Sequence, residues 1–191
     1  GAEGEGFDKI EQRLDKLKEE DNNIDAQFQR PDKKIMNKLA DLYNGNKFLE
    51  VIYKVENLLF NYPSFYALYE ILGAAQTRLC NFEAAVKSYE VVVKLEPNYA
   101  EGHSNLGTSL NAINDSNSAI TSYENALKIE PQLPHVHFNI GVIHQQNNRL
   151  ERAIKSYEKA LTAQPHNILA LNNMGVALRD IGNFQHDLVE F

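Results

Sequence analysis

Apolar residues along this chain return at helical spacing, in pairs of segments separated by short polar turns. The pattern predicts pairs of amphipathic helices at about 65–79 and 82–95, 99–112 and 116–129, and 133–146 and 150–163. A proline closes each second helix, because proline lacks the N–H that would continue it. The prolines that mark this frame are equally spaced, at Pro63, Pro97, Pro131 and Pro165. A fixed period of this length is typical of a solenoid.

Small and aromatic residues recur at fixed places within the period. The columns are Gly73, Gly107, Gly141 and Gly175; Ala85, Ala119 and Ala153; and Tyr89, Tyr123, Tyr157 and Phe191. Glycine and alanine allow the two helices of a pair to approach closely. We expect the aromatic ring to fill the gap between neighbouring repeats.

The Leu-Gly pair, the Ala column, the aromatic column and the closing Pro resemble the tetratricopeptide repeat (TPR) family, from about Ser64 to Phe191. The resemblance implies an all-α fold, a right-handed superhelical solenoid of antiparallel helix pairs. It also implies a concave groove, lined by the first helix of each pair, that takes an extended peptide or a partner's helix. A looser resemblance is to the TPR region that precedes sulfotransferase, glycosyltransferase or oxygenase domains in large bacterial proteins.

The frame divides the chain into seven segments, and the one before the full repeats is degraded. Leu39 stands where later repeats have Gly, and Val51 stands where they have Ala. The last segment stops inside the second helix of a fourth repeat. The segments are 1–6, a flexible lead-in or tag remnant; 7–30, an amphipathic heptad helix; 31–63, a divergent repeat; 64–97, 98–131 and 132–165, full repeats; and 166–191, a truncated repeat.

Both ends of the chain are candidates for self-association. The heptad helix fits either a cap on the open end of the solenoid or a short coiled coil that pairs two copies. The last residues are apolar, whereas a solenoid needs a polar outer face at its ends. The candidate oligomer contacts are Phe7, Ile10, Leu14 and Leu17 at one end and Leu188 and Phe191 at the other.

Composition narrows the class of partner. The chain has 191 residues and a formal net charge of −7, which argues against general binding to nucleic acid or anionic membranes, since these need clustered Lys and Arg. No run of 18 apolar residues and no leader is visible, so we expect no membrane span. The single cysteine, Cys80, fits a reducing compartment. We therefore expect a cytoplasmic protein.

A column of asparagines is the main candidate binding feature. Asn105, Asn139 and Asn173 stand one full period apart on the predicted first helices. Each amide offers donors and an acceptor, so a ladder of them could bracket the backbone of an extended peptide. The TPR region of O-linked N-acetylglucosamine transferases is similar in having such a ladder. Alternatively, these amides hydrogen-bond the adjacent helix.

Other residues near the ladder complete the predicted peptide site. Asn111 and Asn172 lie nearby, and Phe138 also faces inward in this frame. The carboxylate-clamp mode of the family would fall on five positions, of which only Asn105 has the required type. Because an anion needs charge-assisted donors, we exclude that mode. The five positions are Glu70, Ala74, Asn105, His135 and Asn139.

The sequence predicts no catalytic, cofactor or metal site. His135, His137 and His144 are poorly spaced for a helical metal site, and no Gly-rich phosphate loop or Ser-elbow motif is present. The leading hypothesis is a non-catalytic module that binds a protein or extended peptide in the concave groove. The alternatives are a self-associating scaffold element, or the recruiting arm of an enzyme whose catalytic domain lies beyond residue 191.

Overall fold

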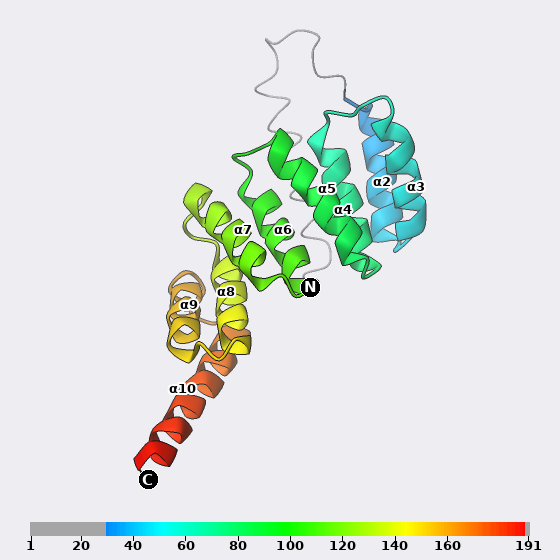
Figure 1. Ribbon diagram of the computed structural model, residues 1–191. Helices are drawn as coiled ribbons and strands as arrows, with labels where there is room; N and C mark the ends of the chain where they lie inside the picture. The colour runs from blue at the N-terminus through cyan, green and yellow to red at the C-terminus, as the bar shows by residue number, and fades with distance from the viewer. Residues whose placement is uncertain (1–29, 190–191) are drawn as a thin grey trace. The chain divides into compact units, whose positions relative to one another are not determined.

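The computed structural model describes residues 30–189, with side chains as far as Gly182. Throughout this range the regular structure is α-helical, so the predicted all-α stack of helix pairs is confirmed (Figure 1). Each helix predicted for the three full repeats begins and ends within one residue of its observed bounds. The helices are α2 (Lys33–Asn44), α3 (Phe48–Leu59), α4 (Tyr66–Arg78), α5 (Phe82–Leu95), α6 (Ala100–Ala112), α7 (Ser116–Ile129), α8 (Pro134–Gln146), α9 (Leu150–Ala163) and α10 (Ile168–Val189).

The helices form two compact units. Unit 1 extends to Pro97 and contains α2 to α5, and unit 2 begins at Asn98 and contains α6 to α10. In unit 2, α6 pairs with α7, and α8 pairs with α9. In addition, α8 packs against α6 and α7, and α10 packs against α9 and α8. Stacking therefore places the first helices α6, α8 and α10 next to one another.

The turn inside each helix pair has the same backbone geometry. Asn46, Cys80, Asn114 and Asn148 have φ values of 58°, 57°, 64° and 55°, and they occupy one column of the repeat frame. The next N–H bonds back to a carbonyl of the preceding helix, as Arg149 N does to His144 O at 2.8 Å. This is a left-handed helix cap, which closes the first helix and reverses the chain. Asparagine tolerates this conformation better than most residues, and cysteine does not share that advantage.

The recurrent geometry of the pairs depends on a ring packed onto a glycine. A Cβ added at Gly107 would lie 2.8 Å from the Tyr123 ring, and one at Gly141 would lie 2.5 Å from the Tyr157 ring. Gly73 and Tyr89 repeat this contact in unit 1, at 2.8 Å. The tyrosine thus fills space inside its own helix pair, whereas the sequence suggested that it fills the gap between repeats.

The pair formed by α2 and α3 fills the same space in another way. Leu39 and Val55 occupy the glycine and tyrosine columns, and their side chains are 1% and 0% exposed. The large side chain has moved to the first helix and the small one to the second. Val51, in the alanine column, is also wholly buried. The divergent sequence therefore keeps a closed core.

The last segment differs from the expectation. A turn and a second helix were expected after Gly182, but α10 is one helix from Ile168 to Val189 (Figure 1). The side chains of Leu188 and Phe191 lie outside the described residues, as does the predicted heptad helix up to residue 29, with Phe7, Ile10, Leu14 and Leu17. Among the described residues, no helix has both the length and the apolar character needed to cross a bilayer.

Candidate functional site

The first helices of unit 2 share a side that carries the predicted ladder. We call it the inner face, and it is continuous because α8 packs against both α6 and α10. Its residues are Glu101, Ser104, Asn105 and Thr108 on α6; His135, Phe138, Asn139 and Val142 on α8; and Leu169, Asn172, Asn173 and Val176 on α10.

The three ladder amides are half-buried. Asn139 lies within hydrogen-bonding reach of the Tyr123 hydroxyl, and Asn173 lies within reach of the Tyr157 hydroxyl. In each case the tyrosine belongs to the second helix of the preceding pair. Burial raises the pKa of both hydroxyls, and the asparagine bonds oppose that rise. For two of the three amides, these contacts favour the alternative in which the amide bonds the adjacent helix.

The bond to tyrosine leaves part of each amide unused. A side-chain amide has two donor hydrogens and an acceptor oxygen, and one bond satisfies one of them. The tyrosines are themselves fixed: the Tyr157 hydroxyl donates to Gln145 Oε1 at 2.7 Å, and the Tyr123 hydroxyl lies 3.0 Å from Thr108 Oγ1. The amides are thus held in position, and part of their surface still faces solvent.

The remaining predicted site residues are less uniform. Asn172 is exposed on the inner face of α10. The Phe138 ring packs against the Tyr157 ring, with centroids 5.8 Å apart, so part of the Phe138 side chain belongs to the core between α8 and α9. Asn111 is half-buried on α6, but its place in the helical turn sets it about 120° around the helix from Asn105. The structure does not bring Asn111 into the ladder.

A polar contact on the inner face was not expected from the sequence. His135 Nε2 lies 3.1 Å from Ser104 Oγ and 3.9 Å from Glu101 Oε2, linking α8 to α6. Glu101 and His135 stand one period apart, in one column. The period alone could have indicated that they are neighbours, because equivalent residues of successive first helices lie side by side.

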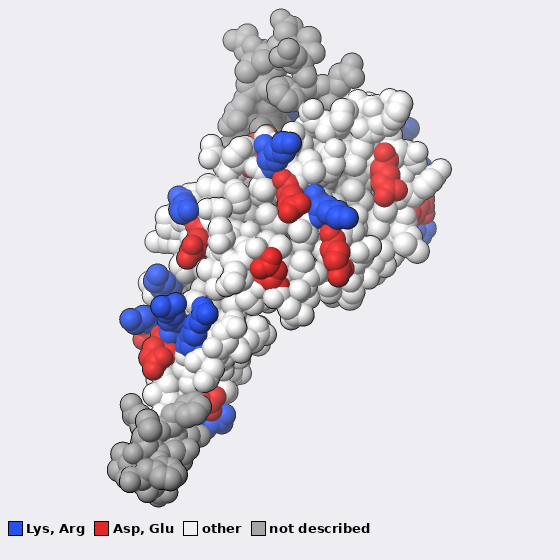
Figure 2. Space-filling model, viewed as in Figure 1, with Lys and Arg blue, Asp and Glu red and all other residues white. Residues whose placement is uncertain are grey.

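Charge is sparse on the inner face. Glu101 and His135 are the only ionisable residues among its members, and the rest are amides, hydroxyls and apolar side chains. Figure 2 shows acidic and basic side chains interspersed on the drawn side of the described residues, with several basic side chains gathered over α9. The inner face itself is therefore nearly uncharged.

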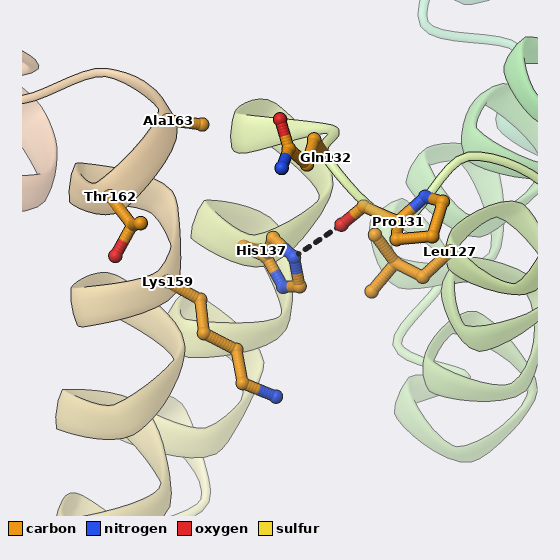
Figure 3. Close-up of a pocket in the computed structure, with 7 residues that line it drawn as sticks. All are labelled: Leu127, Pro131, Gln132, His137, Lys159, Thr162 and Ala163. Atoms are coloured by element: carbon orange, nitrogen blue, oxygen red, sulfur yellow. Dashed lines mark hydrogen bonds between the residues drawn. The ribbon is translucent and has the colours of Figure 1, made fainter.

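A hollow of about 430 Å³ lies elsewhere in unit 2 (Figure 3). Lys159, Thr162 and Ala163 of α9 face His137 across it, and Leu127, Pro131 and Gln132 complete its lining. His137 Nε2 lies 3.1 Å from the Pro131 carbonyl oxygen. Tyr69 makes the equivalent bond, donating to the Pro63 carbonyl at 3.1 Å. This column therefore ties α4 and α8 to the prolines that precede them, which is a structural role.

A second hollow, of about 540 Å³, lies between α2 and α3 in unit 1. Its lining includes the apolar residues Ile35, Leu39 and Leu58 and three lysines, Lys34, Lys38 and Lys54. In the part of the chain that the structure describes, no three His, Cys, Asp or Glu side chains gather where they could hold a metal ion. Cys80 is exposed in its turn.

Two protein-family models match part of the chain. A family model described as TPR repeat matches residues 107–148, and one described as tetratricopeptide repeat matches residues 134–167. No curated protein matches the chain by sequence.

Solved structures share the fold at low sequence identity. The crystal structure of MamA is 20% identical with a TM-score of 0.73, and the match covers 81% of this chain and 87% of that one. The first TPR of Spaghetti (RPAP3), bound to the HSP90 peptide SRMEEVD, is 16% identical with a TM-score of 0.60, covering 61% and 93%. The Arabidopsis OM64 TPR domain is 17% identical with a TM-score of 0.59, covering 60% and 95%. At these identities the likeness concerns the fold.

Proposed function

We propose that the inner face of unit 2 binds an extended segment of a peptide or partner protein. Residues 107–167 of this unit match tetratricopeptide repeat models. One observation supports this most: Asn105, Asn139 and Asn173 stand in one column on adjacent helices and are only half-buried. Tyrosine bonds hold two of these amides in place, so little side-chain entropy is lost when a ligand binds them.

The chemistry of the inner face favours backbone recognition. Amides that lie at a regular spacing can bond successive peptide groups of an extended chain, whatever its side chains. Val142, Leu169 and Val176 flank the ladder and offer apolar contacts; Leu169 is 64% exposed and Val176 is 36% exposed. We therefore propose a neutral ligand with apolar side chains.

The HSP90 peptide bound by the RPAP3 domain is a poor model for this ligand. That peptide, SRMEEVD, is acidic. The inner face has no Lys or Arg to pair with carboxylates, and Glu101 would repel them. The fold is shared, but we expect a different ligand class.

Selection from a display library of random peptides against the immobilised full chain would supply a probe. Fluorescence anisotropy would then compare the selected peptide with SRMEEVD. We expect neutral, apolar sequences to be selected and SRMEEVD not to saturate. Replacing Asn105, Asn139 and Asn173 together by Ala should weaken binding of the selected peptide at least about tenfold.

Matched variants separate lost contacts from lost stability. Tyr123→Phe and Tyr157→Phe remove the hydroxyls beside two of the amides but keep all three amides, so they should weaken binding by less than the triple variant does. Asn117→Ala, on the exposed side of α7, is the control for composition. Unchanged affinity in the triple variant, or selection of acidic peptides, would refute the proposal.

A further inference from the structure

The helix α10 leaves one side uncovered. Ala170 and Ala177 are wholly buried against unit 2, while a second stripe faces solvent. The stripe consists of Ile168, Leu171, Gly175, Leu178 and Gly182. The three apolar side chains are 70%, 44% and 51% exposed.

The same side of the earlier first helices is covered by the second helix of the pair. The tyrosine rings lie on Gly107 and Gly141 there, whereas a Cβ added at Gly175 would meet nothing within 4 Å. The stripe is also more apolar than its counterpart on α8: Leu171 replaces His137, and Leu178 replaces His144. The stripe thus corresponds to a helix face that a second helix covers in the earlier pairs, but on α10 no second helix among the described residues covers it.

Residues 183–191 are a poor cover for this stripe. Through Gly182, where the earlier pairs turn, α10 remains helical up to Val189. In the repeat frame, Asp187 takes the position of Ala85, Ala119 and Ala153, each 0% exposed. Folding back would therefore bury a carboxylate in an alanine-sized space, which is costly unless it is paired.

The stripe is complementary to itself. Its members alternate at spacings of three and four, the pattern by which two helices pack along a seam. In an antiparallel pair, positions of the two seam types face each other. One register sets Leu171 opposite Gly182 of the second copy, and Leu178 opposite its Gly175. Each leucine then covers a glycine, and the two-fold axis repeats both contacts.

The flanking residues agree with that register. It brings Asn172 near Arg179 of the second copy, and Met174 near its Ile181, so no like charges meet. Met174 and Ile181 are each half-buried in the single chain and would add apolar area. We propose that this stripe is the interface of a symmetric dimer, in which α10 of one copy packs antiparallel on α10 of a second copy of this chain.

Sedimentation velocity of the full chain over a wide concentration range tests the association. We expect a reversible monomer–dimer equilibrium, and Leu178→Glu should raise its dissociation constant at least about tenfold while circular dichroism stays unchanged. Leu169→Glu is the matched control, because Leu169 is also well exposed on α10 but lies outside the stripe, on the inner face. A monomer at all concentrations, or equal effects of the two variants, would overturn the proposal.

Cross-linking tests the register. Replacing Cys80, the only cysteine, gives a background in which Gly175→Cys and Leu178→Cys can be made separately. When the two proteins, one carrying a size tag, are mixed under mild oxidation, we expect mixed disulfides in large excess over those from a Leu169→Cys and Val176→Cys mixture. Equal yields would overturn the register. A further variant carries cysteines at both 175 and 191. If it forms an internal disulfide in preference to one between two copies, the chain covers its own stripe.

Discussion

The glycine columns allow one substitution to be tested in two environments. Gly141→Ala places a methyl group 2.5 Å from the Tyr157 ring, whereas Gly175→Ala places it where nothing lies within 4 Å. The ring cannot move away easily, because Tyr157 is wholly buried and its hydroxyl donates to Gln145 at 2.7 Å. The two variants therefore isolate packing from helix propensity.

The expected magnitudes have opposite signs. Alanine is favoured over glycine inside a helix by about 1 kcal/mol. At Gly175 that gain stands alone, so stability should rise by about 1 kcal/mol, if it is measured in dilute solution where the chain is monomeric. At Gly141, overpacking costs about 1–3 kcal/mol, and the severe approach places the net loss at about 1–2 kcal/mol.

Urea and thermal denaturation followed by circular dichroism would measure both effects. A change of about 1 kcal/mol shifts the melting temperature of a chain of this size by about 2–4 °C, so the two variants should separate clearly. Gly107→Ala should behave like Gly141→Ala, since its Cβ would lie 2.8 Å from the Tyr123 ring. If Gly141→Ala were as stabilising as Gly175→Ala, the close ring contact would not exist and the explanation of the glycine column would be wrong.

Three further predictions concern single residues. Cys80→Asn should stabilise unit 1 by up to about 1 kcal/mol, measured by urea denaturation, because Cys80 has a φ of 57° and asparagine adopts this conformation more readily. His137→Leu should destabilise unit 2 by about 1 kcal/mol in the same assay, since it removes the contact to the Pro131 carbonyl. Burial, with help from Arg149 and Arg152, lowers the pKa of His144 below its ordinary value, so stability should fall as the pH drops below about 6.5, where the unfolded chain takes up a proton that the folded chain resists. Between roughly pH 7.5 and pH 5.5, the urea midpoint of the His144→Leu variant should fall less than that of the wild type. Leucine is chosen because Leu110 occupies the same column in α6.

Each of these has a result that contradicts it. A Cys80→Asn variant no more stable than Cys80→Ser would mean that the turn conformation costs nothing. A His137→Tyr variant restores a donor like that of Tyr69, and it should recover stability that His137→Leu loses. An identical pH dependence in wild type and His144→Leu would assign the acid sensitivity to another group.

The sequence was sufficient to predict the helix pairs because three signals agree in every full repeat. Apolar spacing sets the helices, proline ends them, and small residues allow them to pair. The inner-face column was also visible, since residues one period apart on stacked first helices must be neighbours. The contacts of Asn139 and Asn173 with tyrosine could not be predicted, because the column shows which residues are neighbours but not the direction in which an amide side chain points. The contact of His135 with Glu101 was overlooked although it follows from the same period.

The straight course of α10 shows what the local signal cannot decide. Cys80 is a poor residue for a left-handed turn, yet it adopts one, while Gly182, the most permissive residue for that conformation, stands in the same column and is helical. Local preference therefore does not set the turn. In the three full pairs a tyrosine ring packs on the glycine of the first helix, and at Gly175 that contact is missing. The reversal thus depends on the packing of the second helix, and a carboxylate in the alanine column opposes that packing. While α10 continues straight through Gly182, its apolar stripe faces solvent.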